Sequence, residues 1–206
     1  MLSEEETAGL TLRAESTTDL PDQHLAEVFE RCRDGDVSAF RHVVREFQGF
    51  ALALAYRILR DEEESKDVVQ EAFIRIWRHF ARYDPKTKFT TWLYSIVTHL
   101  CYDRLRGRRK RRETHAEHID ERLPVGADPD NDPEQRFAQK ELADAVGHFT
   151  EKLPPTQRLV FVLRDLQELS VREVSSILHI SESSVKTNLL YARRFLREQL
   201  KPFLQE

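Results

Sequence analysis

Apolar residues recur at helical spacing in two long parts of the sequence. In the first, about residues 25–106, polar turns interrupt the pattern at 34–36, 61–63 and 84–88. This arrangement predicts a bundle of about four helices. In the second part, residues 135–206, an amphipathic segment over 135–149 is followed by three shorter helical units. We therefore predict an all-α protein with two small helical domains.

The remaining segments have no such pattern. Residues 1–22 are polar and acidic, which predicts a disordered tail. Residues 113–134 combine prolines and a glycine with many acidic side chains and offer little to bury, which predicts a flexible acidic linker. The expected organisation is a tail over 1–22, a first domain over 23–112, a linker over 113–134 and a second domain over 135–206.

The charge of the chain is unevenly distributed. The formal net charge is −4, yet seven of the nine residues 104–112 are basic, whereas residues 113–136 hold eight acidic and two basic side chains. A basic cluster of this kind is unusual as mere surface and indicates an anionic partner such as DNA. RNA, a membrane or a localisation receptor would also fit. We hypothesise that the acidic linker and tail lie against the basic surfaces and weaken DNA binding by the free protein.

Cysteine usage and the N-terminus suggest where the protein works. Cys32 and Cys101 match no metal-ligand spacing and are expected to be reduced thiols. The N-terminus lacks the positive charge of a signal peptide, and no apolar stretch approaches the roughly 20 residues of a membrane span. We therefore expect a cytoplasmic protein without direct membrane contact.

A helix-turn-helix motif is predicted near the C-terminus. Ser170 and Glu173 have the spacing of a capping box, so a helix should begin between them. A short break follows at 179–181, and Ser181 can cap a second helix. The second helix should bury three apolar residues: Val185, Leu189 and Ala192. The turn offers His179 where glycine is usual, at a cost of roughly 1 kcal/mol if φ is positive.

The outer face of the second helix carries side chains suited to duplex DNA. Those expected to bond base edges are Ser183, Ser184, Lys186, Thr187, Asn188 and Tyr191. Those expected to neutralise phosphates are Arg193, Arg194 and Arg197. An ordinary helical hairpin with a solvated basic face remains the alternative.

The first domain has two further candidate surfaces. The helix over 67–80 has a polar face that either is solvated or docks a partner: Asp67, Gln70, Glu71, Arg75 and Arg78. The next segment combines lysines and aromatics: Tyr83, Lys86, Lys88, Phe89 and Trp92. An exposed aromatic loop beside a basic helix end suits melted nucleic acid. Alternatively, Trp77, Phe89 and Trp92 belong to the core and the arginines are solvated.

Several strings together resemble a known family. Residues 67–73 with Trp77, residues 89–94, and residues 103–106 before the arginine run resemble the second domain of extracytoplasmic-function (ECF) sigma factors of the sigma-70 family. The second half is similar to their fourth domain through residues 153–154, 157–158, the capping box, 185–187 and 192–193. The resemblance covers about residues 25–204 in the right order.

The resemblance implies an RNA polymerase sigma factor rather than an enzyme, with no cofactor or metal. It implies that the polar face of 67–80 docks on the polymerase core, and that the C-terminal helix reads the minus-thirty-five element. The aromatic loop would read and open the minus-ten element together with His99, Tyr102, Asp103, Arg106 and Arg109. An anti-sigma factor is a further implied partner. Lys66, His99 and Asn188 depart from the residues common in the family.

Two other interpretations compete with this one. A stand-alone helix-turn-helix regulator would bind operator DNA without polymerase and usually as a dimer, but the sequence offers no separate dimerisation stripe. An enzyme or metal protein has little support, because His115 and His118 form an isolated pair in the linker.

Overall fold

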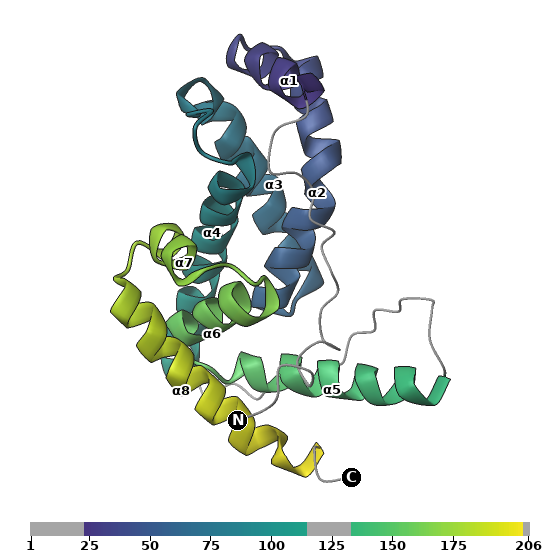
Figure 1. The fold of residues 1–206 in the computed structure, drawn as a ribbon, viewed down its shortest axis with the longest axis vertical. Helices are drawn as coiled ribbons and strands as arrows, with labels where there is room; N and C mark the ends of the chain where they lie inside the picture. The colour runs from purple at the N-terminus through teal and green to yellow at the C-terminus, as the bar shows by residue number, and fades with distance from the viewer. Residues whose placement is uncertain (1–22, 115–132, 204–206) are drawn as a thin grey trace.

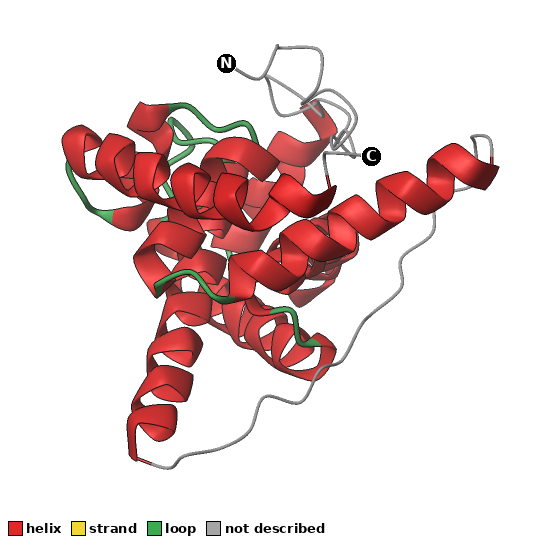
Figure 2. Ribbon diagram, turned by 90° about the horizontal axis from the view of Figure 1, so that it is seen from below, coloured by secondary structure: helices red, strands yellow, loops and turns green. Residues whose placement is uncertain are grey.

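The computed structural model describes residues 23–114 and 133–203, which form helices joined by short loops (Figures 1 and 2). The helices are α1 (Gln23–Arg33), α2 (Val37–Leu59), α3 (Glu62–His79), α4 (Phe89–Thr114), α5 (Pro133–Glu151), α6 (Pro155–Phe161), α7 (Val171–Leu178) and α8 (Glu182–Leu200). The predicted tail and linker residues 115–132, with His115 and His118, lie outside the described residues. In the described part of the chain, no helix is long and apolar enough to cross a bilayer.

The predicted four-helix first domain is confirmed as α1–α4. Two of its helices, α2 and α3, begin where an aspartate satisfies free backbone amides. The Asp36 carboxylate accepts from the amides of Ser38 and Ala39 at 2.7 and 3.1 Å, and Asp61 accepts from the Glu64 amide at 2.8 Å. The polar turns seen in the sequence therefore end one helix and start the next.

An aromatic cluster fills the end of this bundle nearest α1. Phe80 is in its centre, in the short 3-10 turn η2 (Phe80–Arg82) after α3, and contacts the rings of Phe29, Tyr83 and Phe89. The Tyr83 hydroxyl donates to the Thr87 carbonyl oxygen at 2.6 Å. This bond closes the turn that leads into α4.

The second domain contains the predicted helix-turn-helix, formed by α7 and α8. Both bonds of the capping box are present, with Glu173 N to Ser170 Oγ at 3.2 Å and Ser170 N to Glu173 Oε2 at 2.8 Å. The turn residue His179 has φ of 53°, which confirms the left-handed conformation that the sequence suggested. The apolar face of α8 is buried as predicted.

The two domains pack against each other. The α6–α7 region lies across the lower half of α4 (Figure 1), and α4 contacts both helices. Arg60 at the end of α2 approaches Asp144 and Glu151 of α5, each at 3.9 Å. Arg57 donates to the Leu166 carbonyl oxygen at 3.2 Å. The sequence pattern gave no indication of this interdomain contact.

Candidate functional site

An apolar groove runs between α2 and α3. It has a volume of about 740 Å³, and its walls include Phe40 and Leu52 from α2 and Phe73 from α3. Val37 and Ile74 also line it and are 56% and 43% exposed, although both are large apolar side chains. An accessible apolar groove of this size is suited to another macromolecule.

The predicted polar face of α3 borders this groove. Asp67, Gln70, Arg75 and Arg78 are exposed, and Gln70 lines the groove itself. Glu71 is half-buried and forms ion pairs with Arg75 and Arg104. We did not predict from the sequence that α2 and Ile74 line this groove. Ile74 lies off the apolar stripe of 67–80, and an isoleucine in such a position could have indicated an exposed apolar contact.

The structure corrects the expectation of an exposed aromatic loop. Tyr83 and Phe89 are buried in the aromatic cluster, so the expected exposure is wrong for both residues. Trp92 is half-buried and stacks on Tyr83, with 5.3 Å between ring centroids. The core alternative was right for Phe89 because five rings gather around Phe80, those of Phe29, Phe40, Tyr83, Phe89 and Trp92, and remove one another from water. Lys86 and Lys88 remain exposed in the turn.

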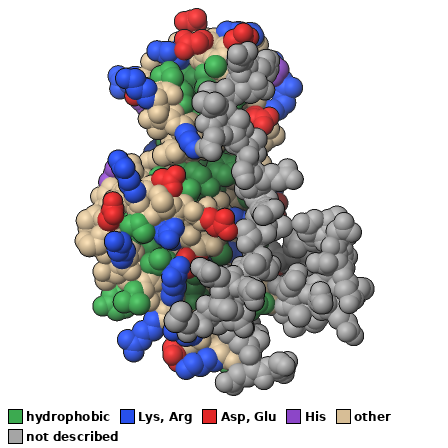
Figure 3. Space-filling model, viewed as in Figure 1, with side chains coloured by type: hydrophobic (Ala, Val, Ile, Leu, Met, Phe, Trp, Pro, Cys, Tyr) green, Lys and Arg blue, Asp and Glu red, His purple; other side chains and the backbone are tan. Residues whose placement is uncertain are grey.

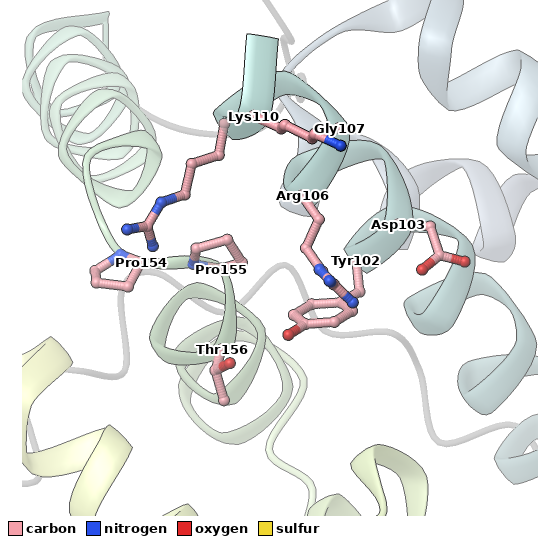
Figure 4. A pocket seen from close by; sticks show the side chains of 9 residues that line it. Tyr102, Asp103, Arg106, Gly107, Lys110, Pro154, Pro155 and Thr156 are labelled. Atoms are coloured by element: carbon pink, nitrogen blue, oxygen red, sulfur yellow. The ribbon is translucent and has the colours of Figure 1, made fainter. Parts of the chain in front are cut away.

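A basic cavity lies between the C-terminal half of α4 and the start of α6 (Figure 4). It has a volume of about 730 Å³ and is lined on the α4 side by Tyr102, Asp103, Arg106, Gly107, Arg109 and Lys110. The opposite wall consists of Pro154, Pro155 and Thr156. The Arg106 guanidinium lies over the Tyr102 ring, 5.8 Å from its centroid. Cations beside an aromatic ring suit a nucleic acid strand, whose phosphates and bases they can contact together.

The second domain covers the part of α4 that precedes this cavity. The His99 ring stacks on His179 of the helix-turn-helix turn, with 5.3 Å between centroids. Nδ1 of His99 is 2.7 Å from the Ser95 carbonyl oxygen. The structure thus places all five predicted residues of this region on one helix: His99, Tyr102, Asp103, Arg106 and Arg109. The last three are exposed, whereas His99 and Tyr102 are half-buried where α6 and α7 contact α4.

The domain boundary also buries a charged side chain. Arg158 of α6 is 4% exposed, and its Nε and Nη2 atoms have no hydrogen-bond partner. Burial lowers the pKa of Arg158 to about 10 and raises the pKa of the Cys101 thiol to about 12. The positive charge of Arg158 partly offsets the rise in the pKa of Cys101, and α6, which carries Arg158, contacts α4, which carries Cys101.

The predicted DNA-binding side chains of α8 fall into two groups. Lys186, Thr187, Tyr191, Arg194 and Arg197 form the first group and are exposed. The second group makes hydrogen bonds within the domain, although Ser183 and Arg193 are exposed too: Ser183 and Ser184 with Ser181 Oγ, each at 2.9 Å, Asn188 with the Ser184 carbonyl oxygen at 2.8 Å, and Arg193 with both carboxylate oxygens of Asp165 at 2.6 and 2.8 Å. The Asp165 carboxylate raises the pKa of Arg193.

In comparison with known proteins, two separate parts of the chain match two family models. Residues 43–111 match the family model "Sigma-70 region 2", and residues 143–196 match "Sigma-70, region 4". The chain is 35% identical over 176 residues to the ECF RNA polymerase sigma factor SigW of Bacillus subtilis, covering 84% of this chain and 94% of that protein. It is 30% identical over 190 residues to the ECF RNA polymerase sigma-E factor of Escherichia coli K12, covering 90% and 97%.

The fold is also similar to a solved structure. The sigma factor RpoE of Bartonella quintana, crystallised in complex with the anti-sigma factor NepR, aligns with a TM-score of 0.63 and 16% identity. The alignment covers 82% of this chain and all of that one. At this identity the likeness concerns the fold.

Proposed function

The chain belongs to the ECF RNA polymerase sigma factors of the sigma-70 family, and from this membership we propose which of its surfaces bind polymerase and promoter DNA. Residues 23–112 would form the domain that binds the polymerase core and the minus-ten element. Residues 135–206 would form the domain that binds the minus-thirty-five element. The observation that carries the proposal is the accessible α2–α3 groove with its polar border.

We assign the groove to the polymerase core. Val37 and Ile74 would lose their exposed apolar area on docking, which is the main favourable term in most protein association. The neighbouring polar residues Asp67, Gln70 and Arg78 would supply the rim of hydrogen bonds and charges that fixes orientation. Arg75 and Glu71 already pair with each other and would form part of the same rim.

The exposed side of α4 is assigned to the minus-ten element. Tyr102, Asp103, Arg106 and Arg109 would contact the melted strand, with Lys86 and Lys88 near the backbone. Base stacking on an aromatic side chain contributes roughly 1 to 3 kcal/mol, which offsets part of the cost of opening the duplex. Tyr83 and Phe89 would act from the core by holding the turn in place.

Promoter engagement then requires the domains to separate. Pro154, Pro155 and Thr156 of α6 form one wall of the cavity in front of α4, and His179 covers His99. Asp103, Arg106 and Arg109 are exposed in this arrangement, but α6 and α7 lie beside the half-buried His99 and Tyr102, so a DNA strand can contact the whole of this side of α4 only after α6 and α7 move away. We propose that docking on polymerase accompanies this separation, since the two promoter elements must be bound at once.

We also propose an anti-sigma partner for this chain. The support is the family membership and the Bartonella quintana relative, which was crystallised with such a factor. The partner would compete with polymerase for the α2–α3 groove. The stand-alone regulator is not favoured, because it leaves the groove and the region 2 similarity unexplained.

The test is co-elution with sigma-free bacterial core polymerase on size-exclusion chromatography. The wild-type chain should form a complex that then binds fork-junction promoter DNA. Ile74→Glu should weaken complex formation about tenfold or more, because it places a charge in an apolar contact. Ala143→Glu adds the same charge at an exposed position of α5 and should have no effect.

Either of two results would contradict the proposal. If Ile74→Glu assembled like the wild type, the groove would not be the docking surface. If the wild-type chain bound duplex DNA tightly but never polymerase, the stand-alone regulator would become the better interpretation.

A further inference from the structure

Four large apolar side chains are exposed among the described residues: Val37, Ile74, Leu190 and Tyr191. The first two share the α2–α3 groove, whereas Leu190 is on α8 and is 65% exposed. The buried face of α8 is already complete through Val185, Leu189, Ala192 and Leu196. Leu190 therefore contributes little to the core and needs another explanation.

The helical register places Leu190 within the surface proposed to face DNA. It follows Thr187 by three residues and Lys186 by four, so the three side chains are neighbours on one face. Arg194 continues the same face one turn later. The alkyl side chain of Leu190 thus lies between Lys186 and Thr187, which can bond base edges, and Arg194, which can reach a phosphate. In Figure 3, hydrophobic surface interrupts the basic side chains at the edge of the molecule where the α7–α8 region lies.

The chemistry of the major groove limits what an alkyl side chain can recognise there. Leucine has no hydrogen-bond donor or acceptor, whereas the edges of guanine, cytosine and adenine present polar atoms that lose water on contact. Thymine presents a C5-methyl group, which gains from contact with an apolar side chain. A leucine in the groove therefore favours thymine over the other bases.

We propose that Leu190 is a specificity-determining residue that reads a thymine methyl group in the minus-thirty-five element. This inference rests on the proposed function, because it requires α8 to enter the major groove. It adds a base preference that the hydrogen-bonding groups of α8 do not explain. Lys186 and Thr187 would read polar edges next to that thymine.

The experiment uses full-length protein assembled with core polymerase. Duplexes bound by this complex are first selected from a random library, and each thymine of the selected minus-thirty-five element is then replaced by deoxyuridine. This replacement removes the methyl group and leaves every hydrogen-bonding atom in place. For one or two thymines, wild-type affinity should fall about fourfold, the effect of roughly one buried methylene.

Variants of Leu190 show whether this side chain is responsible. Leu190→Ala should bind the thymine duplex about fourfold more weakly and should no longer distinguish thymine from deoxyuridine. Leu190→Met keeps an apolar side chain of similar volume and should retain the discrimination. Because Leu190 is exposed, neither variant should disturb folding.

Three results would overturn the inference. The first is a selected element that lacks thymine, and the second is a deoxyuridine effect that persists unchanged in Leu190→Ala. The third is an equal loss of affinity by Leu190→Ala for the thymine and deoxyuridine duplexes, which is expected if Leu190 contacts protein. In each case the complex still forms and binds promoter DNA, so the proposed function stands. Failure to form any DNA-binding complex would overturn both.

Discussion

The hydroxyl group of Tyr94 donates a hydrogen bond to Gln167 Oε1 across the domain boundary, with 2.9 Å between the two oxygens. Tyr94 lies on α4 and is buried, and Gln167 follows the π-type turn (Val162–Leu166) that extends α6. The Tyr94–Gln167 hydrogen bond and the Arg57 bond to the Leu166 carbonyl oxygen together fix this turn against the first domain. These two polar contacts contribute, with the Arg60 ion pairs and the stacking of His99 on His179, to the arrangement of the two domains.

Removing the Tyr94 hydroxyl should favour domain separation. Tyr94→Phe deletes one hydrogen bond, which contributes about 1 kcal/mol, so the population of separated molecules should rise about fivefold. Cys101 offers the readout, because it is fully buried on α4, the helix that α6 and α7 contact, and burial raises the pKa of its thiol to about 12. Alkylation of Cys101 at neutral pH should become about fivefold faster in the variant.

Cys32 provides an internal control for this measurement. It is buried on α1 of the first domain, and burial raises the pKa of its thiol to about 11. Its alkylation rate should be the same in both proteins. Equal acceleration at the two cysteines would indicate general loss of stability, and no change at Cys101 would remove Tyr94 as an interdomain contact.

The same contact should fail at alkaline pH. Burial raises the pKa of Tyr94 to about 12, above the value near 10 of a solvated tyrosine. A raised folded-state pKa means that the contribution of Tyr94 is complete below about pH 10 and is lost as the pH rises towards 12. An energy-transfer pair, one dye per domain, should report separation in this range. The transition should be weaker in Tyr94→Phe, and identical curves would contradict the assignment.

Local sequence patterns were enough for the helices and the turns. Asp36 and Asp61 end up as helix caps, and Ser170 with Glu173 forms a complete capping box, because these contacts involve residues two or three positions apart. The short turn at 179–181 was also predicted, and His179 has the positive φ to which we assigned a cost from the sequence. Such short-range contacts can be predicted without knowing the tertiary arrangement.

Long-range packing could not be predicted in the same way. Tyr83 and Phe89 have the composition of a recognition loop, but the rings that bury them include Phe29, from a helix more than fifty positions earlier in the chain than Tyr83. The contacts of Tyr94 with Gln167 and of His99 with His179 join the two domains across a much longer separation. No periodicity within one helix indicates such a partner.

Replacing the buried Arg158 should stabilise the free protein. Its Nε and Nη2 atoms have no hydrogen-bond partner and its pKa is lowered to about 10, both signs that the charge is poorly solvated. Arg158→Met retains most of the volume without the charge and should raise the free energy of unfolding by about 1 kcal/mol or more in urea titrations. Arg158→Ala leaves a cavity and should gain less. A loss of stability in Arg158→Met would show that the guanidinium is favourably bound.

Two neighbouring arginines of α8, Arg193 and Arg194, should differ in their effect on the salt dependence of DNA binding. Arg194 can reach a phosphate freely, and its loss should reduce the slope of log affinity against log salt by about 0.9. Arg193 is held by both oxygens of Asp165, which neutralises part of its charge, so Arg193→Ala should reduce the slope less. Asp165→Asn should free Arg193 and increase the slope, whereas Arg33→Ala in α1 should leave it unchanged. Equal slopes for the Arg193 and Arg194 variants would show that the Asp165 pair opens on DNA.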